Sequence, residues 1–98
     1  MYLVTFGKYA CKDKQLLKNA GLEKKAKDLL NLLSVNSFEN PPPYEKLLGN
    51  LENYYSRRIN LQHRLVYSVE KNESGLRDAD GNPYEGIVYV KRMWTHYE

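Results

Sequence analysis

The chain has 98 residues, enough for one domain with a single modest core, and its 42% hydrophobic and 28% charged residues are typical of a soluble globular protein. The net charge of +3 is small, but residues 1–33 hold seven lysines against three acids, so a polyanion would be attracted mainly by this part. A lone cysteine excludes an internal disulfide and a thiolate metal site within one chain, and no stretch approaches the length of a membrane span.

The N-terminal third predicts a strand and two helices. Tyr2–Phe6 is rich in β-branched and aromatic residues, which favours a strand. It is too short for the apolar region of a signal peptide and no basic residue precedes it, so we expect a cytoplasmic protein. A helix from Tyr9 would place Leu16, Leu17 and Ala20 on one side and would end at Gly21.

The second predicted helix carries apolar residues with helical spacing. They are Leu22, Ala26, Leu29, Leu30 and Leu33. Such a stripe faces a core, so the two helices should form a hairpin that covers a sheet. Pro41–Pro43 then predicts a stiff, extended connector, because proline fixes φ and restricts the residue before it.

The central stretch predicts a β-hairpin with strands at Tyr54–Asn60 and His63–Glu70. On alternating positions, Arg57 would share one face with Tyr55 and Ile59, whereas Arg58 would lie on the opposite face. Since both faces carry apolar residues, the pair should lie in the middle of the sheet, with helices on one side.

The C-terminal third predicts a polar, exposed connection at Lys71–Gly86 without a chemical role, followed by a last strand at Ile87–Trp94. The order is therefore β-α-α-β-β-β. We expect an α+β fold in one domain, residues 1–98, with an N-terminal strand, a helical hairpin and a three-stranded antiparallel meander.

Four cationic side chains stand on or beside the hairpin, among tyrosines: Arg57, Arg58, His63 and Arg64. Arginine suits phosphate because its planar guanidinium engages two oxygens at once, and tyrosine rings can stack on bases. RNA is thus the first ligand to consider, and an ordinary solvated sheet face is the alternative.

Cleavage of RNA without a metal requires a base for the 2′-hydroxyl, a cation for the phosphorane and an acid for the leaving 5′-oxygen. Glu45, Arg64 and His96, with Tyr97 beside the histidine, are the candidates, although only the fold could bring them together. Two histidines without a cysteine pair give no zinc pattern, and the glycines form no phosphate loop, so we expect no metal and no cofactor.

Four motifs resemble the YoeB/Txe toxins of the RelE superfamily, which belong to type II toxin–antitoxin modules. They are Pro43–Leu47, Tyr55–Ile59, His63–Tyr67 and the C-terminal His96-Tyr97. The resemblance is close over residues 43–70 and 87–97. It extends only as a pattern over the N-terminal strand and helices, and residues 71–86 look like an insertion.

This resemblance implies a RelE-like fold and a ribosome-dependent endoribonuclease, or mRNA interferase, that is inhibited by a cognate antitoxin of the YefM/Phd type. By position, Glu45 matches the general base, Arg64 the phosphate-stabilising arginine and His96 the general acid. Tyr97 matches the tyrosine that orders the substrate, and Arg58 a second basic residue. We further expect RNA contacts from Arg57, Lys46 and His63, whereas a homodimer is left open.

Two positions depart from the family pattern. Many relatives have a lysine where Leu48 stands, and Lys46 is the nearby candidate to replace it. Relatives also commonly end at the tyrosine, whereas this chain adds Glu98.

Two other functions fit the same fold. A non-catalytic gyrase poison of the ParE type would not need Glu45, His96 and Tyr97, and it would leave mRNA intact. A plain RNA-binding module would show salt-sensitive binding without a cleaved product.

Overall fold

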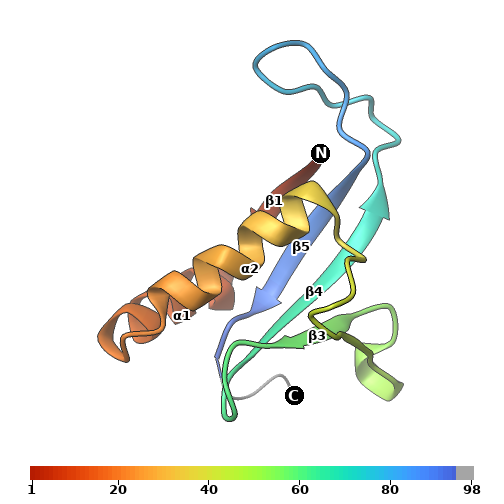
Figure 1. Cartoon of the computed structure of the whole chain (residues 1–98). Helices are drawn as coiled ribbons and strands as arrows, with labels where there is room; N and C mark the ends of the chain where they lie inside the picture. Colours follow the sequence, from red (N-terminus) through yellow and green to blue (C-terminus); the bar gives the residue numbers. More distant parts are fainter. Residues whose placement is uncertain (95–98) are drawn as a thin grey trace.

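The computed structural model describes residues 1–94 and confirms the α+β fold (Figure 1). The elements in chain order are β1 (Tyr2–Phe6), α1 (Lys8–Asn19), α2 (Glu23–Val35), β2 (Glu45–Lys46), a 3₁₀ turn (Gly49–Leu51), β3 (Tyr55–Arg58), β4 (Arg64–Lys71) and β5 (Gly86–Arg92). The two-residue strand β2 was not predicted, since so short a segment has no alternation to detect.

The strands form one sheet in the order β1-β5-β4-β3-β2. The predicted meander is confirmed, because β3, β4 and β5 pair antiparallel in sequence. The first strand pairs with the last, and this pairing is parallel, so the sheet as a whole is mixed. The central position predicted for the hairpin is also confirmed, since β4 lies between β5 and β3.

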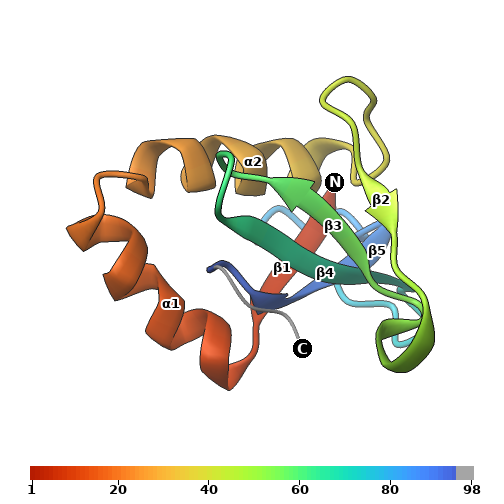
Figure 2. The same ribbon diagram turned by 90° about the horizontal axis from the view of Figure 1, so that it is seen from below.

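Both helices contribute to one core on one face of the sheet (Figure 2). The predicted stripe of α2 is confirmed: Ala26 and Leu33 are buried, and its other three leucines pack against the core. The side of α1 was predicted less well, because Leu16 is exposed whereas Ala10 and Leu17 are buried. Within residues 1–94, neither helix is long and apolar enough to cross a membrane.

The turn between the helices follows the predicted cap. Gly21 has a φ of +73°, a conformation that glycine adopts without steric cost. The backbone N–H of Leu22 donates to the carbonyl of Leu17, and that of Gly21 donates to the carbonyl of Lys18. These two bonds form a Schellman motif, which ends α1 and reverses the chain.

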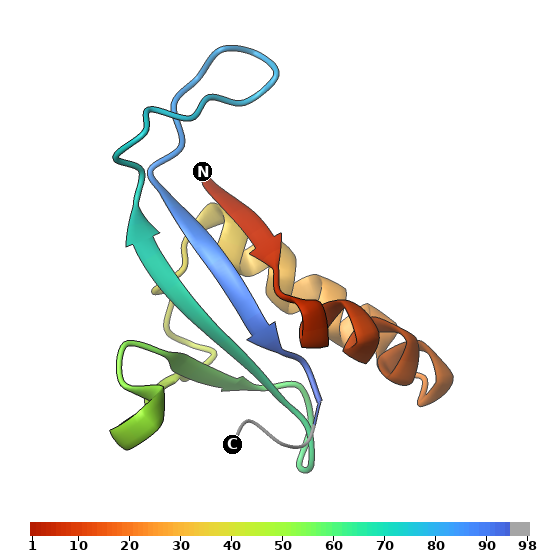
Figure 3. The same cartoon turned by 180° about the vertical axis from the view of Figure 1, so that it is seen from behind.

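The opposite face of β4 and β5 has no helix over it in the part of the chain that the structure describes (Figure 3). Strand alternation places on this open face the residues at positions 54, 56 and 58 of the β3 segment and 64, 66 and 68 of β4. The helix-covered face holds Arg57, Leu65 and Tyr67, which are all buried. The predicted division of the hairpin into two faces is therefore correct.

The connection between β4 and β5 extends beyond the end of the sheet (Figure 1). It is held by its own hydrogen bonds: the side-chain amide of Asn72 donates to the carbonyls of Leu76 and Tyr84 and accepts from the N–H of Leu76. The N–H of Glu85 also donates to the carbonyl of Met1. The predicted polar connection is thus a hydrogen-bonded loop that follows the C-terminal end of β4. Arg64 lies at the N-terminal end of the same strand.

Candidate active site

Glu45, Ser56 and Arg64 lie side by side on the open face, on three neighbouring strands. Glu45 of β2 is paired with Ser56 of β3, and Ser56 is paired with Val66, two residues after Arg64 on β4. Nη1 of Arg64 lies 3.2 Å from the hydroxyl oxygen of Ser56, to which it donates, and 3.7 Å from Oε2 of Glu45. The fold therefore brings together Glu45 and Arg64, which are separated in the sequence by the 3₁₀ turn, β3 and the hairpin turn.

Arg58 and Arg64 stand directly opposite each other on β3 and β4. Directly opposite like charges destabilise a sheet, because their Cβ atoms are only about 5 Å apart. Both arginines line a small cavity of about 100 Å³, together with Pro42, Pro43, Glu45 and Ser56. Two guanidinium groups and one carboxylate around a cavity form a site that an anion would stabilise.

The two partners of the Arg64–Glu45 pair differ in exposure. The side chain of Glu45 is 66% exposed, whereas that of Arg64 is 21% exposed and is also held by Ser56. An exposed ion pair contributes little free energy, so a phosphate can replace the carboxylate as the partner of Arg64. The carboxylate would then be available as a proton acceptor beside the bound phosphate.

Arg57 is not on the open face, and its position corrects the prediction that it contacts RNA. It is 1% exposed. Its Nε donates to the hydroxyl of Tyr67 at 2.9 Å, and its two Nη atoms donate to the carbonyls of Pro42, Ser37 and Glu39 at 2.6, 3.1 and 2.8 Å. The guanidinium group thus fixes the connector that leads to β2.

Tyr67 is fully buried beneath the sheet, where its hydroxyl accepts a hydrogen bond from Arg57. Burial raises the pKa of its phenol above the ordinary value of 10.0, while the hydrogen bond and the charge of Arg57 oppose this rise. The phenol is therefore neutral throughout the physiological range. It acts as a structural partner of Arg57 beneath the sheet.

His63 and Lys46 also lie away from the Glu45–Arg64 pair. His63 is 8% exposed, and its ring stacks on Trp94 with 3.8 Å between centroids. Lys46 is exposed, but it is paired with Tyr55, so it projects from the face of β2 opposite to Glu45. These placements do not support the predicted RNA contacts beside Glu45 and Arg64.

His96 and Tyr97 lie outside the described residues. The last described residue, Trp94, accepts a hydrogen bond at 3.2 Å from the backbone N–H of Arg64. The described chain therefore ends alongside the first residue of β4. Within residues 1–94, no three histidine, cysteine, aspartate or glutamate side chains form a group that could hold a metal ion.

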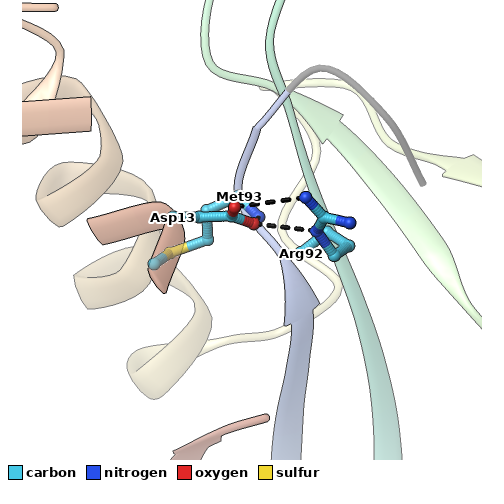
Figure 4. A network of polar contacts seen from close by, with 3 residues as sticks. All are labelled: Asp13, Arg92 and Met93. Atoms are coloured by element: carbon cyan, nitrogen blue, oxygen red, sulfur yellow. Dashed lines mark hydrogen bonds and ion pairs between the residues drawn. The ribbon is translucent and has the colours of Figure 1, made fainter. Parts of the chain in front are cut away.

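Asp13 anchors the end of β5 to α1, a role that the sequence reading did not identify (Figure 4). Its carboxylate accepts bonds from Nε and Nη2 of Arg92 at 2.9 and 3.2 Å, and from the backbone N–H of Met93 at 2.9 Å. Asp13 is buried between Ala10 and Leu17 on the inner side of α1. An aspartate at an inward position of a lysine-rich helix is the sequence signal that indicates such a buried partner.

The chain matches the family model described as the YoeB-like toxin of bacterial type II toxin–antitoxin systems, over residues 6–80. It is also 40% identical over 57 residues to the curated Toxin YoeB of Synechocystis sp.. That alignment covers 58% of this chain and 59% of the cyanobacterial protein, so the chain spans less than two thirds of this relative's length.

Solved structures from Staphylococcus aureus are similar over nearly the whole chain. The YoeB dimer is 31% identical with a TM-score of 0.70, and the alignment covers 98% of each chain. The YoeB–YefM complex contains a chain that is 31% identical with a TM-score of 0.69, and the alignment covers 99% of each chain.

Proposed function

The chain belongs to the YoeB-like toxins of bacterial type II toxin–antitoxin systems, and from this premise we propose that it is an endoribonuclease that cuts messenger RNA on the ribosome and so inhibits translation. One observation carries the proposal: Arg58 and Arg64 face each other beside Glu45 on the open face. A protein that only needed a stable sheet would not place two like charges opposite each other, whereas a phosphate bound between them would offset their repulsion.

The proposed reaction proceeds through attack by the 2′-hydroxyl of the RNA. Glu45 accepts the proton of this hydroxyl, and the 2′-oxygen forms a bond to phosphorus as the bond from phosphorus to the 5′-oxygen breaks. Arg64 stabilises the charge that develops on the phosphorane, and Arg58 supplies a second cation. The products are a 2′,3′-cyclic phosphate and a 5′-hydroxyl, and all proton transfers use side chains.

His96 is the proposed acid that protonates the leaving 5′-oxygen, and Tyr97 is proposed to order the substrate. Both assignments rest on the resemblance of the terminal His-Tyr motif. The hydrogen bond between Arg64 and Trp94 supports them, because His96 follows only two residues after Trp94 in the sequence. The site would then combine a base from β2, a cation from β4 and an acid from the C-terminus.

An antitoxin is the proposed protein partner, and a homodimer the proposed alternative assembly. The Staphylococcus aureus relatives are a YoeB–YefM complex and a YoeB dimer. An acidic segment of an antitoxin would suit the two open-face arginines, since a carboxylate offers the same pair of oxygens as a phosphate. Co-purification of the protein expressed from its native operon tests this, and the absence of any stable complex would count against it.

Primer extension on mRNA after induction of the protein tests the proposed activity. The parent should produce cuts at defined positions within codons. Replacement Arg64→Ala should reduce cleavage by roughly 10²–10³-fold, as expected for loss of a group that stabilises charge in the transition state.

Arg77→Ala is the matched control, since Arg77 lies in the β4–β5 connection, where it donates to the carbonyl of Gly81. It should cleave like the parent. Intact mRNA together with inhibited DNA supercoiling would instead favour a gyrase poison, and undiminished cleavage by Arg64→Ala would remove this arginine from the mechanism.

A further inference from the structure

We propose that Lys91 is a further substrate-binding residue, which contacts an RNA phosphate next to the one held by Arg64. The proposal rests on the proposed RNA cleavage and extends its site across the open face from β4 to β5. Lys91 would supply the additional positive charge that was expected from Lys46. Lys46 does not supply it to this face, because its side chain projects from the opposite face of β2.

Lys91 is the extra residue of a β-bulge. Tyr67 is paired with Val90 and Val66 with Arg92, so Lys91 has no partner position of its own on β4. Bulges re-aim side chains and are frequent beside active sites. This one lies in the row of paired residues that runs from Glu45 through Ser56 and Val66 to β5.

The ammonium group of Lys91 lies over the open face. Its Nζ is 5.5 Å from the centroid of the Tyr54 ring, and Tyr54 stands two residues before Ser56 and so shares its face. An aromatic ring attracts a cation and keeps it oriented without neutralising its charge. No ion pair in the described part of the chain involves Lys91, so its positive charge is available to an anion.

The surroundings of Lys91 can accommodate a nucleotide. Lys91 lines a cavity of about 420 Å³ with Leu48, Asn50 and Leu51. Strand spacing and rise put the Cα atoms of Lys91 and Arg64 roughly 10 Å apart, close enough for the two long side chains to hold neighbouring phosphates of one strand. The cavity contains an exposed leucine and an amide, which suit a base and its polar edge.

The test uses the full chain on ribosomes programmed with mRNA, and it measures cleavage kinetics as well as binding of an uncleavable 2′-O-methyl mRNA. Lys91→Met keeps the aliphatic stem and removes the charge. We expect KM to rise about 10-fold with kcat nearly unchanged, and the slope of log affinity against log salt to fall by about 0.7 for the single-stranded phosphate that is lost.

Three further variants separate a phosphate contact from a structural role. Lys91→Arg should retain the parent KM, because it preserves the charge. Leu48→Lys in the Lys91→Met background should recover most of the lost affinity, since residue 48 lines the same cavity. Lys71→Met, at the far end of β4, should leave KM and the salt slope unchanged.

The outcomes distinguish the two proposals. If the parent cleaves and Lys91→Met retains both KM and the salt slope, the assignment of Lys91 is overturned while the proposed function stands. If the parent does not cleave but Lys91→Met still lowers the salt slope, the proposed function fails and the RNA contact remains. A loss of affinity that neither Lys91→Arg nor Leu48→Lys restores would indicate a packing role and would also overturn the assignment.

Discussion

Consecutive arginines of β3 have opposite surroundings because a strand directs successive side chains to opposite faces. Arg57 is buried beneath the sheet, where it donates to Tyr67 and to three carbonyls of the connector. Arg58 is exposed opposite Arg64. The buried Arg57 therefore stabilises the fold, whereas the exposed Arg58 contributes to the proposed phosphate site.

Arg57→Met should destabilise the protein by about 3 kcal/mol, since it leaves buried carbonyls and the Tyr67 hydroxyl without their donor. Arg58→Met is the matched control. It should leave stability unchanged or raise it by up to about 1 kcal/mol, because it removes a like-charge pair. Urea unfolding measures both, and equal losses from the two replacements would contradict the division of roles.

Tyr67→Phe should show a pH-dependent effect on stability. The pKa of Tyr67 is raised above 10.0 in the folded state, so above that pH the unfolded chain binds fewer protons than the folded one and the parent loses stability. The phenylalanine variant should be less stable by about 1–2 kcal/mol near neutral pH, where it lacks the bond to Arg57.

This deficit should shrink as the pH rises past 10.0, the ordinary pKa of the phenol. Urea midpoints of both proteins across that range provide the measurement. A constant difference between them would mean that the phenol titrates in the folded protein as it does in the unfolded chain.

Alternation in the sequence correctly predicted that Arg57 and Arg58 lie on opposite faces, but not which of them is buried. That outcome depends on where the helices pack, and helix packing is a property of distant contacts. His63 illustrates the same point, because its burial depends on Trp94, thirty-one residues later in the sequence. The pairing of Glu45 with Arg64 likewise requires β2, which is too short to leave a pattern.

At the scale of elements, the ion pair between Asp13 and Arg92 connects α1 to the end of β5. Asp13 also accepts a bond from the N–H of Met93, so the backbone is fixed where the strand ends. Trp94 follows directly and is bonded to Arg64. The helix therefore positions the segment that leads toward the proposed acid.

Asp13→Asn should lower the free energy of unfolding by about 3 kcal/mol, because the largely buried guanidinium of Arg92 would lose its charge partner. Asp28→Asn is the control, since Asp28 forms an exposed i,i+4 pair with Lys24 and should contribute at most about 0.5 kcal/mol. Thermal or urea unfolding compares them. Equal effects would show that the Asp13 network adds nothing beyond a surface ion pair.

The elements themselves were largely predictable, because the spacing of apolar residues carries over to local structure. The α2 stripe from Leu22 to Leu33 and the strand at Tyr2–Phe6 are found where expected. The parallel pairing of β1 with β5 could not be predicted from either strand. It joins Tyr2 to Gly86 across almost the whole chain, and nothing in the local sequence of either strand specifies its partner.

At the scale of the molecule, the fold separates stability from the proposed chemistry. Helices and core occupy one face of the sheet, and the ordered β4–β5 connection extends away from it (Figure 1). Glu45, Arg58, Arg64 and Lys91 lie on the other face. Substitutions of the exposed charged side chains of this face, such as Glu45 and Arg58, should therefore change activity with little effect on folding.

The most direct test of the proposed mechanism is the chemistry of the cut on programmed ribosomes. An mRNA with a single 2′-deoxynucleotide immediately 5′ of the scissile phosphate should remain intact at that position, because no 2′-hydroxyl is available for Glu45 to deprotonate. The matched all-ribose mRNA should be cut there, with a 2′,3′-cyclic phosphate and a 5′-hydroxyl at the new ends. Equal cleavage of the two RNAs would contradict the account.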